Sequence, residues 1–402
     1  MSAPLPLPAA RRAALLLALA SAIGGSAGPI AIGTGGLVGL ALLPPDQAEL
    51  ATIPVAAYVI GSAAAAMPAA LTMRRIGRRA GFMLGATAGG LGAALTGFAI
   101  MAGSFWSFCI SLALMGVASA FIQQYRFAAA DAAEPSYKPR AIAWVMAGGI
   151  VTGVVGPQIA IHAGALLPDA PFAGPFFVLV VLFGLAMLAL SRLEVPPPPP
   201  LAAGGRATGT IMRQPRFVVA LVAAVASYAL MSLVMTATPI AMIEHHHSHA
   251  DAQTGIQWHV IAMFAPSFFT GGLIARFGKS AIATAGLLLI ALSATVAIAG
   301  TSLWHFWVAL VLLGVGWNFG FIASTAMVAD LYRPEEAFRV QAVNEFVLFA
   351  VVAVASLASG GLLAVGGWTV VNLIVYPVVL LTVLLIVGLA ILDRRAPRTA
   401  AP

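Results

Sequence analysis

Apolar segments of about 20 residues recur along the whole chain, and each is long enough to cross a roughly 30 Å hydrocarbon layer as a helix. Charged residues make up only 8% of the chain, whereas soluble proteins average about 25%. A chain of this composition has too little charge to cover a soluble surface. The sequence therefore predicts an all-α integral membrane protein.

Twelve of these segments are expected to be transmembrane helices. Arg11 and Arg12 precede the first segment, as they would precede a signal peptide. At about 22 residues the segment is longer than an apolar signal core, so we expect a retained helix. The expected spans are 13–35, 51–72, 81–103, 105–127, 141–165, 172–192, 216–241, 255–275, 280–301, 304–329, 341–364 and 369–392.

The basic residues are distributed unevenly between the two ends of these spans. If the N-terminus is cytoplasmic, Lys and Arg occupy the inward segments and none falls in an outward loop; Arg126 and Arg192 are placed at cytoplasmic helix ends. This positive-inside pattern predicts a multi-pass protein of the bacterial inner membrane with both termini in the cytoplasm. We attribute the net charge of +7 to membrane topology and to contact with anionic lipid, not to nucleic-acid binding. The single Cys109 excludes an internal disulfide.

A proline-rich run, EVPPPPPLAAGG at Glu194–Gly205, lies near the middle of the chain. Consecutive prolines favour extended polyproline II, which makes a semi-rigid spacer. We therefore expect a six-helix lobe at 1–193, a cytoplasmic linker at 194–212 and a second six-helix lobe at 213–402.

Two short patterns recur between the halves. RRIGRR at 74–79 aligns with ARFGKS at 275–280, an offset of 201 residues. A second set, at an offset of 199, consists of Asp131, Pro135 and Arg140 matched by Asp330, Pro334 and Arg339. A duplicated six-helix unit is typical of transporters that bind substrate between two lobes and expose it to each side in turn.

Several charged residues near the inner helix ends are candidates for gating. We interpret Asp131 with Arg140, and Asp330 with Arg339, as links that bias one of two gated states. Glu345 follows Arg339 by six residues. Pairing with a cytoplasmic arginine at an inner gate is the favoured role for Glu345, and carrying a coupling proton is the alternative.

The segment ALTMRRIGRRAGFML at 70–84 resembles the loop motif between the second and third helices of the major facilitator superfamily. Ala70 stands where the motif usually has its first glycine, and Arg74 where it has the aspartate of a charge-relay lock. The resemblance implies a twelve-helix fold of two lobes. GGIVTGVVGP at 148–157 is similar to the glycine–proline pattern of drug–proton antiporters, but close packing of small residues also explains it.

Two residue pairs on the seventh and eighth spans suggest a metal. Met231 and Met235 are four residues apart, as are His259 and Met263, so each pair shares one helix face. Both pairs fall in the outer half of the membrane. Thioether and imidazole ligands suit Cu(I), and a histidine within a span is a candidate functional residue. Core packing is the alternative for the methionines.

The MxxxM and HxxxM pair resembles the signature of the CcoA-like copper importers within the superfamily. The resemblance implies that Met231, Met235, His259 and Met263 bind copper as transported substrate, for assembly of cbb3-type cytochrome oxidase. We also expect copper chaperones as partners and a monomeric protein. The outer loop EHHHSHAD adds a candidate capture site, which consists of His245, His246, His247 and His249.

Two rival functions stay open. An organic-solute transporter, importing riboflavin or exporting drugs, would use aromatic and hydrogen-bonding residues such as Trp144, Trp258, Trp317 and Asn318. A non-transporting copper sensor or assembly factor would have little need for two lobes. No nucleophile–base set supports an enzyme. No phosphate-binding glycine-rich loop is present, so we expect neither ATP as energy source nor a tightly bound cofactor.

Overall fold

The computed structural model describes residues 5–134, 136–196, 204–333 and 335–395, and within them every regular element is helical. The proline run from 197 to 200, Pro135 and Pro334 lie outside the described residues. The first half contains α1 (Leu7–Gly24), α2 (Ala27–Leu42), η1 (Pro45–Thr52), α3 (Ile53–Ile76), α4 (Arg78–Met101), α5 (Phe105–Ile122), α6 (Tyr125–Ala132), α7 (Lys138–His162), η2 (Ala163–Leu166) and α8 (Gly174–Leu190). The second half contains α9 (Thr208–Met212), α10 (Pro215–Glu244), α11 (His249–Phe264), α12 (Ser267–Phe277), α13 (Lys279–Ala299), α14 (Leu303–Ala329), α15 (Ala337–Leu373) and α16 (Val375–Arg395).

Each of the twelve expected spans coincides with one helix or with two consecutive helices. Four spans are broken, because α1 and α2, α5 and α6, α11 and α12, and α15 and α16 each share one span. The α11–α12 pair bends by 44° just before Ser267, where Pro266 cannot donate a backbone hydrogen bond. The fold class is therefore confirmed, while the continuity of these four spans is corrected.

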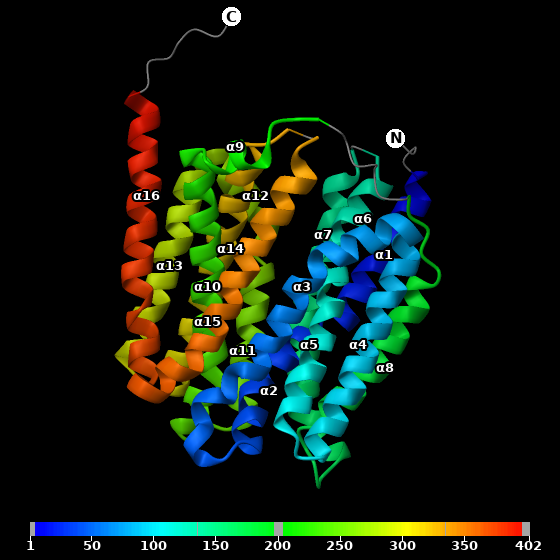
Figure 1. The fold of residues 1–402 in the computed structure, drawn as a ribbon, viewed down its shortest axis with the longest axis vertical. Helices are drawn as coiled ribbons and strands as arrows, with labels where there is room; N and C mark the ends of the chain where they lie inside the picture. The colour runs from blue at the N-terminus through cyan, green and yellow to red at the C-terminus, as the bar shows by residue number, and fades with distance from the viewer. Residues whose placement is uncertain (1–4, 135, 197–203, 334, 396–402) are drawn as a thin grey trace, which may run out of the picture.

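The helices gather into two lobes (Figure 1). Helices α1 and α3–α8 form one lobe and α9–α16 the other, while α2 and η1 reach across between them at one end of the bundle. Each lobe has its own apolar core. The start of α1, the end of α16 and α9 share one end of the bundle, which we call the terminal face. The other end, with η1 and η2, is the opposite face.

Small residues let helices of the first lobe approach closely. A Cβ atom added to Gly61 of α3 would lie 1.9 Å from the Ala113 carbonyl oxygen of α5. A Cβ atom on Gly116 of α5 would lie 2.1 Å from the Tyr58 carbonyl oxygen of α3. Both contacts are with backbone, which cannot rotate away, so only glycine permits this crossing.

A Gly116→Ala substitution is therefore expected to destabilise the protein by about 1–3 kcal/mol through overpacking. Gly184→Ala on α8 is the matched control, because a Cβ atom there meets nothing within 4 Å. Thermal unfolding of the purified proteins in detergent measures the difference. Equal melting temperatures for the two variants would contradict the described α3–α5 contact.

The two repeated loop motifs have the same structure. Gly77 and Gly278 adopt φ angles of +86° and +88°, a region that favours glycine, and each is followed by the first residue of a helix. In the first lobe Arg78 Nη2 donates to Asp131 Oδ2 over 2.6 Å. Lys279 makes the equivalent ion pair with Asp330 in the second lobe. This agreement supports an internal duplication.

These ion pairs correct the expected gating links. Asp131 pairs with Arg78 rather than Arg140, which is exposed. Asp330 pairs with Lys279 rather than Arg339, whose Nη2 donates to the Gly204 carbonyl oxygen over 2.7 Å. Sequence spacing suggested partners on the next helix, but the motif loop places a basic residue closer to each aspartate.

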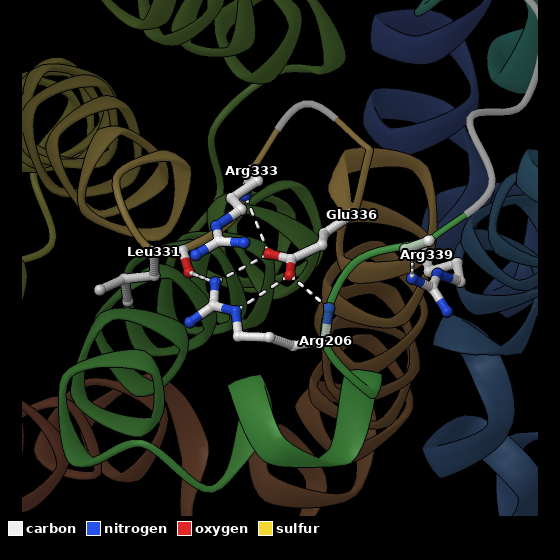
Figure 2. A network of polar contacts seen from close by, with 6 residues as sticks. Arg206, Leu331, Arg333, Glu336 and Arg339 are labelled. Atoms are coloured by element: carbon white, nitrogen blue, oxygen red, sulfur yellow. Dashed lines mark hydrogen bonds and ion pairs between the residues drawn. The ribbon is translucent and has the colours of Figure 1, made fainter.

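The end of the linker is fixed to the second lobe (Figure 2). Arg206 makes a two-pronged ion pair with the buried Glu336, over 2.9 Å from Nε and 2.7 Å from Nη2. The backbone amides of Arg206 and Arg333 also donate to this carboxylate, and Arg206 reaches the Leu331 carbonyl oxygen. Residues from about 204 onward therefore belong structurally to the second lobe.

The hydrogen bonds from Arg206 hold the pKa of Glu336 well below its usual value. Because the folded-state pKa is depressed, the carboxylate stabilises the fold above its unfolded pKa of about 4.3 and loses this effect as pH falls. Glu336→Gln should lower the melting temperature by the same amount at pH 7 and at pH 6. A difference that disappears at pH 6 would contradict this assignment.

Candidate functional site

The four residues expected to bind copper lie in the second lobe. Met231, Met235 and Met263 all belong to its apolar core. His259 is fully buried, and its Nδ1 donates over 2.8 Å to the Leu310 carbonyl oxygen of α14. The methionine positions are what core packing predicts, and a copper site here stays a prediction.

The four histidines of the candidate capture site do not converge. His246 is exposed, with φ of +63°. The other rings have separate partners: His245 Nδ1 donates to the Ala241 carbonyl oxygen (2.7 Å), His247 Nε2 to the Thr301 carbonyl oxygen (2.8 Å), and His249 packs against Phe172 with ring centroids 5.4 Å apart. No group of three or more His, Cys, Asp or Glu residues suited to a metal occurs in the described part of the chain. The loop thus gives no support for metal capture.

The lobes meet in the half of the bundle nearer the opposite face. Gln158 of α7 donates to Gln257 of α11 over 2.8 Å. A Cβ atom on Gly153 would lie 3.0 Å from Val260, so the glycine-rich run packs α7 against α11 as its small residues suggest. On the other side of the interface, a Cβ atom on Gly360 of α15 would lie 2.7 Å from the Glu49 carbonyl oxygen of η1. These contacts close the opposite face in this structure.

An aromatic cluster lies halfway along the second lobe, where α10, α14 and α15 meet. Trp317 and Phe321 stack one turn apart on α14, with centroids 5.2 Å apart and planes at 14°. Tyr228 of α10 contacts both rings at 5.3 Å and Phe349 of α15 at 5.8 Å. Tyr228 and Phe321 are only partly buried. We call Tyr228, Trp317, Phe321 and Phe349 the aromatic cluster.

The first lobe contributes a charged residue, Arg126, near the aromatic cluster. Arg126 on α6, Glu345 of α15 and the Tyr228 hydroxyl lie close enough for their charges to influence one another. Tyr228 also interacts with Tyr58 of α3. Tyr228 therefore belongs to the aromatic cluster and also lies near charged residues of both lobes. Arg126, on another helix, is the arginine whose charge acts on Glu345, and the gating role of Glu345 stays a prediction.

Two polar groups at this place lack partners within the described residues. Trp317 Nε1 and Arg126 Nε are buried nitrogen donors without a hydrogen-bond acceptor. Leaving a buried donor unpaired costs about 1–3 kcal/mol, so each such group calls for an explanation. Trp317 is 7% exposed and both donors are buried, so a planar ring can stack here and accept from these donors only after the surrounding helices move apart.

Some residues of this site were not predicted from the sequence. Trp317 was among the candidates for an organic-solute site, but Arg126 was placed at a helix end and Tyr228 had no assigned role. The signal was present in FIQQYRF, where Gln123, Gln124 and Arg126 follow one another inside an expected span. Intramembrane polar residues are functional candidates by default.

The other aromatic and amide candidates for an organic-solute site differ in their exposure. Trp144 and Trp258 are about half exposed. Asn318 is fully buried and already satisfied, because it accepts from Thr270 over 2.6 Å and donates to the Met263 carbonyl oxygen over 2.6 Å. Asn318 therefore ties α14 to α11 and α12 and is not free to bind a solute.

Similar proteins identify the family. The profile described as Major Facilitator Superfamily matches residues 13–265 and 220–402. Riboflavin transporter RfnT of Brucella anthropi is 48% identical over 377 residues, which cover 93% of this chain and 94% of that protein. The uncharacterized MFS-type transporter YddS of Bacillus subtilis is 31% identical over 381 residues, covering 89% of this chain and 86% of the relative.

Solved structures share the fold. The xylose transporter XylE of E. coli, in a partially occluded inward-open conformation, superposes with a TM-score of 0.68 at 11% identity, covering 98% of this chain and 99% of XylE. The human organic anion transporter MFSD10 gives a TM-score of 0.65 at 16% identity, covering 94% and 99%. The chain belongs to the major facilitator superfamily of secondary transporters.

Proposed function

We propose that this protein is a riboflavin transporter that carries the vitamin into the cytoplasm. The observation that carries the proposal is the 48% identity to Riboflavin transporter RfnT over nearly the full length of both chains. The comparisons favour this alternative over the copper import that the MxxxM and HxxxM pattern suggested.

The chemistry of the site agrees with this substrate. Riboflavin has a planar three-ring system with carbonyl and imino groups along one edge. The stacked Trp317 and Phe321 offer flat faces to the ring system, and Trp317 Nε1 and Arg126 Nε are donors for its polar edge. Riboflavin requires no thioether or other metal ligands, which agrees with the packing of the methionines in the apolar core.

The proposed mechanism is alternating access. The terminal face is taken as cytoplasmic, as the positive-inside pattern predicts, and the inner membrane of a bacterium is the expected location. Contacts such as Gln158–Gln257 then close the periplasmic side, and rocking of the lobes breaks them to admit substrate. The site lies between the lobes at the middle of the membrane, where it is exposed to each side in turn.

Growth and uptake in a bacterial strain that neither makes nor imports riboflavin test the proposal. Expression of this chain is expected to restore growth on low riboflavin and the uptake of radiolabelled riboflavin. Membrane expression must be confirmed, and cellular copper is measured in the same cultures. Restored copper accumulation without riboflavin uptake would contradict the proposal and favour the copper importer.

A triple methionine variant distinguishes riboflavin transport from copper transport. Met231→Leu, Met235→Leu and Met263→Leu together remove three thioethers while nearly preserving side-chain volume, which costs below about 1.5 kcal/mol per site. Riboflavin uptake by this variant is expected to stay within about twofold of the wild type. Uptake lost in step with copper binding, in a variant that still folds, would show that the thioethers have a function beyond packing.

A further inference from the structure

A small cavity lies at the terminal face, between the start of α1 and the segment that follows α8. Its volume is about 270 Å³, and it is lined by Pro8, Arg12 and Leu16 of α1 together with Arg192 and Glu194. Both arginines and Glu194 are exposed. Within the described residues, neither guanidinium has an ion pair or a hydrogen bond, and the Glu194 carboxylate has none either. Three charged groups therefore line one cavity without a protein partner.

The two arginines continue the lipid-facing sides of their helices. Leu15 and Leu19 follow Arg12 by three and seven residues, so they share its helix face, and they are 51% and 49% exposed. Leu188 precedes Arg192 by four residues and is 63% exposed. Leucines this exposed in membrane spans face acyl chains, and arginines at the ends of such spans lie at the level of the headgroups.

A phospholipid headgroup matches these charges. Guanidinium groups bind phosphate through paired hydrogen bonds, and basic pockets between helices on the cytoplasmic side of a membrane bind phospholipid headgroups. Glu194 adds a carboxylate, which repels a headgroup that carries only negative charge and attracts one that also carries an ammonium group. The charges of the cavity therefore favour a phosphate with an amine beside it over a phosphate alone.

We propose that this cavity binds phosphatidylethanolamine, with Arg12 and Arg192 on the phosphate, Glu194 on the ammonium group, and the acyl chains along the exposed leucines of α1 and α8. The ethanolamine headgroup has one phosphate and one primary ammonium group, which matches two cations and one anion. Phosphatidylglycerol lacks the ammonium group, and phosphatidylcholine has no N–H to donate. None of the aromatic cluster residues lines this cavity, so the inference does not depend on which solute is carried.

Native mass spectrometry of the purified full-length protein in detergent tests the proposal. Phosphatidylethanolamine, phosphatidylglycerol and phosphatidylcholine with identical acyl chains are added in equal amounts, and the occupancy of each lipid on the protein is measured. The wild type is expected to prefer phosphatidylethanolamine about threefold over each of the others, as one exposed ion pair can provide. Excess inorganic phosphate should not displace the lipid, because the acyl chains also contribute to binding.

Three variants define the cause. Glu194→Gln should still bind lipid but lose the preference for phosphatidylethanolamine over phosphatidylglycerol. Arg12→Gln combined with Arg192→Gln should lower the occupancy of all three lipids at least about tenfold, because each arginine contributes roughly fivefold near a lipid phosphate. Arg140→Gln is the matched control: this arginine is exposed at the start of α7 and does not line the cavity, so the variant should bind lipid like the wild type.

A wild type that binds phosphatidylglycerol as well as phosphatidylethanolamine overturns the proposal, whatever the variants do. An unchanged preference in Glu194→Gln also overturns it, as does lipid retained by the double arginine variant. Equal loss in Arg140→Gln would show that only the overall positive charge matters, and displacement by inorganic phosphate would show that free phosphate is the ligand. Thermal unfolding in the same detergent confirms that each variant is folded.

Discussion

Replacing Tyr228 by alanine is expected to reduce riboflavin uptake by at least about tenfold. The ring contacts Trp317, Phe321 and Phe349, and its hydroxyl lies near Arg126 and Glu345. Aromatic pairs contribute roughly 0.5–1.5 kcal/mol each beyond burial, so losing three also loosens the stacking surface. Initial rates of radiolabelled uptake, normalised to protein in the membrane, measure the effect.

Tyr228→Phe is the matched control for this change. It keeps all three ring contacts and removes only the hydroxyl, so uptake should fall much less than in the alanine variant. If Tyr228→Ala folds and transports at the wild-type rate, the aromatic cluster is not the binding site. If both variants lose uptake equally, the hydroxyl and its charged partners, rather than stacking, are what substrate binding requires.

A Gly360→Leu substitution is expected to abolish uptake by a different route. A Cβ atom at this position would already lie 2.6 Å from Thr52 Oγ1 and 2.7 Å from the Glu49 carbonyl oxygen, so a leucine side chain would clash with η1. The contact between α15 and η1 closes the opposite face, so a bulky residue should prevent closure and hold the transporter open on that side. Transport requires both states and should therefore stop.

The neighbouring Gly361 provides the control. A Cβ atom there meets nothing within 4 Å, so Gly361→Leu is expected to retain most of the uptake. Riboflavin binding by detergent-solubilised protein should persist in Gly360→Leu, because the aromatic cluster is not touched. Normal uptake in Gly360→Leu would show that closure at this contact is not part of the transport cycle.

Much of the fold follows from periodicity and length alone. All twelve spans could be placed because an apolar run of about 20 residues has few alternatives in a bilayer. The duplicated motif loops were also visible, since Gly77 and Gly278 need the same left-handed backbone. The breaks within spans were not predicted, because Gly25 and Gln123 do not interrupt the hydrophobic pattern strongly enough.

The site was harder to predict, because it consists of side chains from α6, α10, α14 and α15 that meet only after the two lobes assemble. Spacing along one helix pointed instead to Met231 and Met235, whose regular i, i+4 relation is equally typical of core packing. Neighbours across the lobes, such as Arg126 and Glu345, are 219 residues apart. Their proximity leaves no local pattern in the sequence.

The most direct test of the account is riboflavin transport by the purified protein in proteoliposomes. Labelled riboflavin should enter vesicles that contain the wild type and exchange with unlabelled riboflavin inside, whereas vesicles with Tyr228→Ala should take up little more than empty ones. Copper added outside should neither be carried nor change the rate. Saturable copper entry, together with riboflavin uptake no greater than in empty vesicles, would contradict the proposed function.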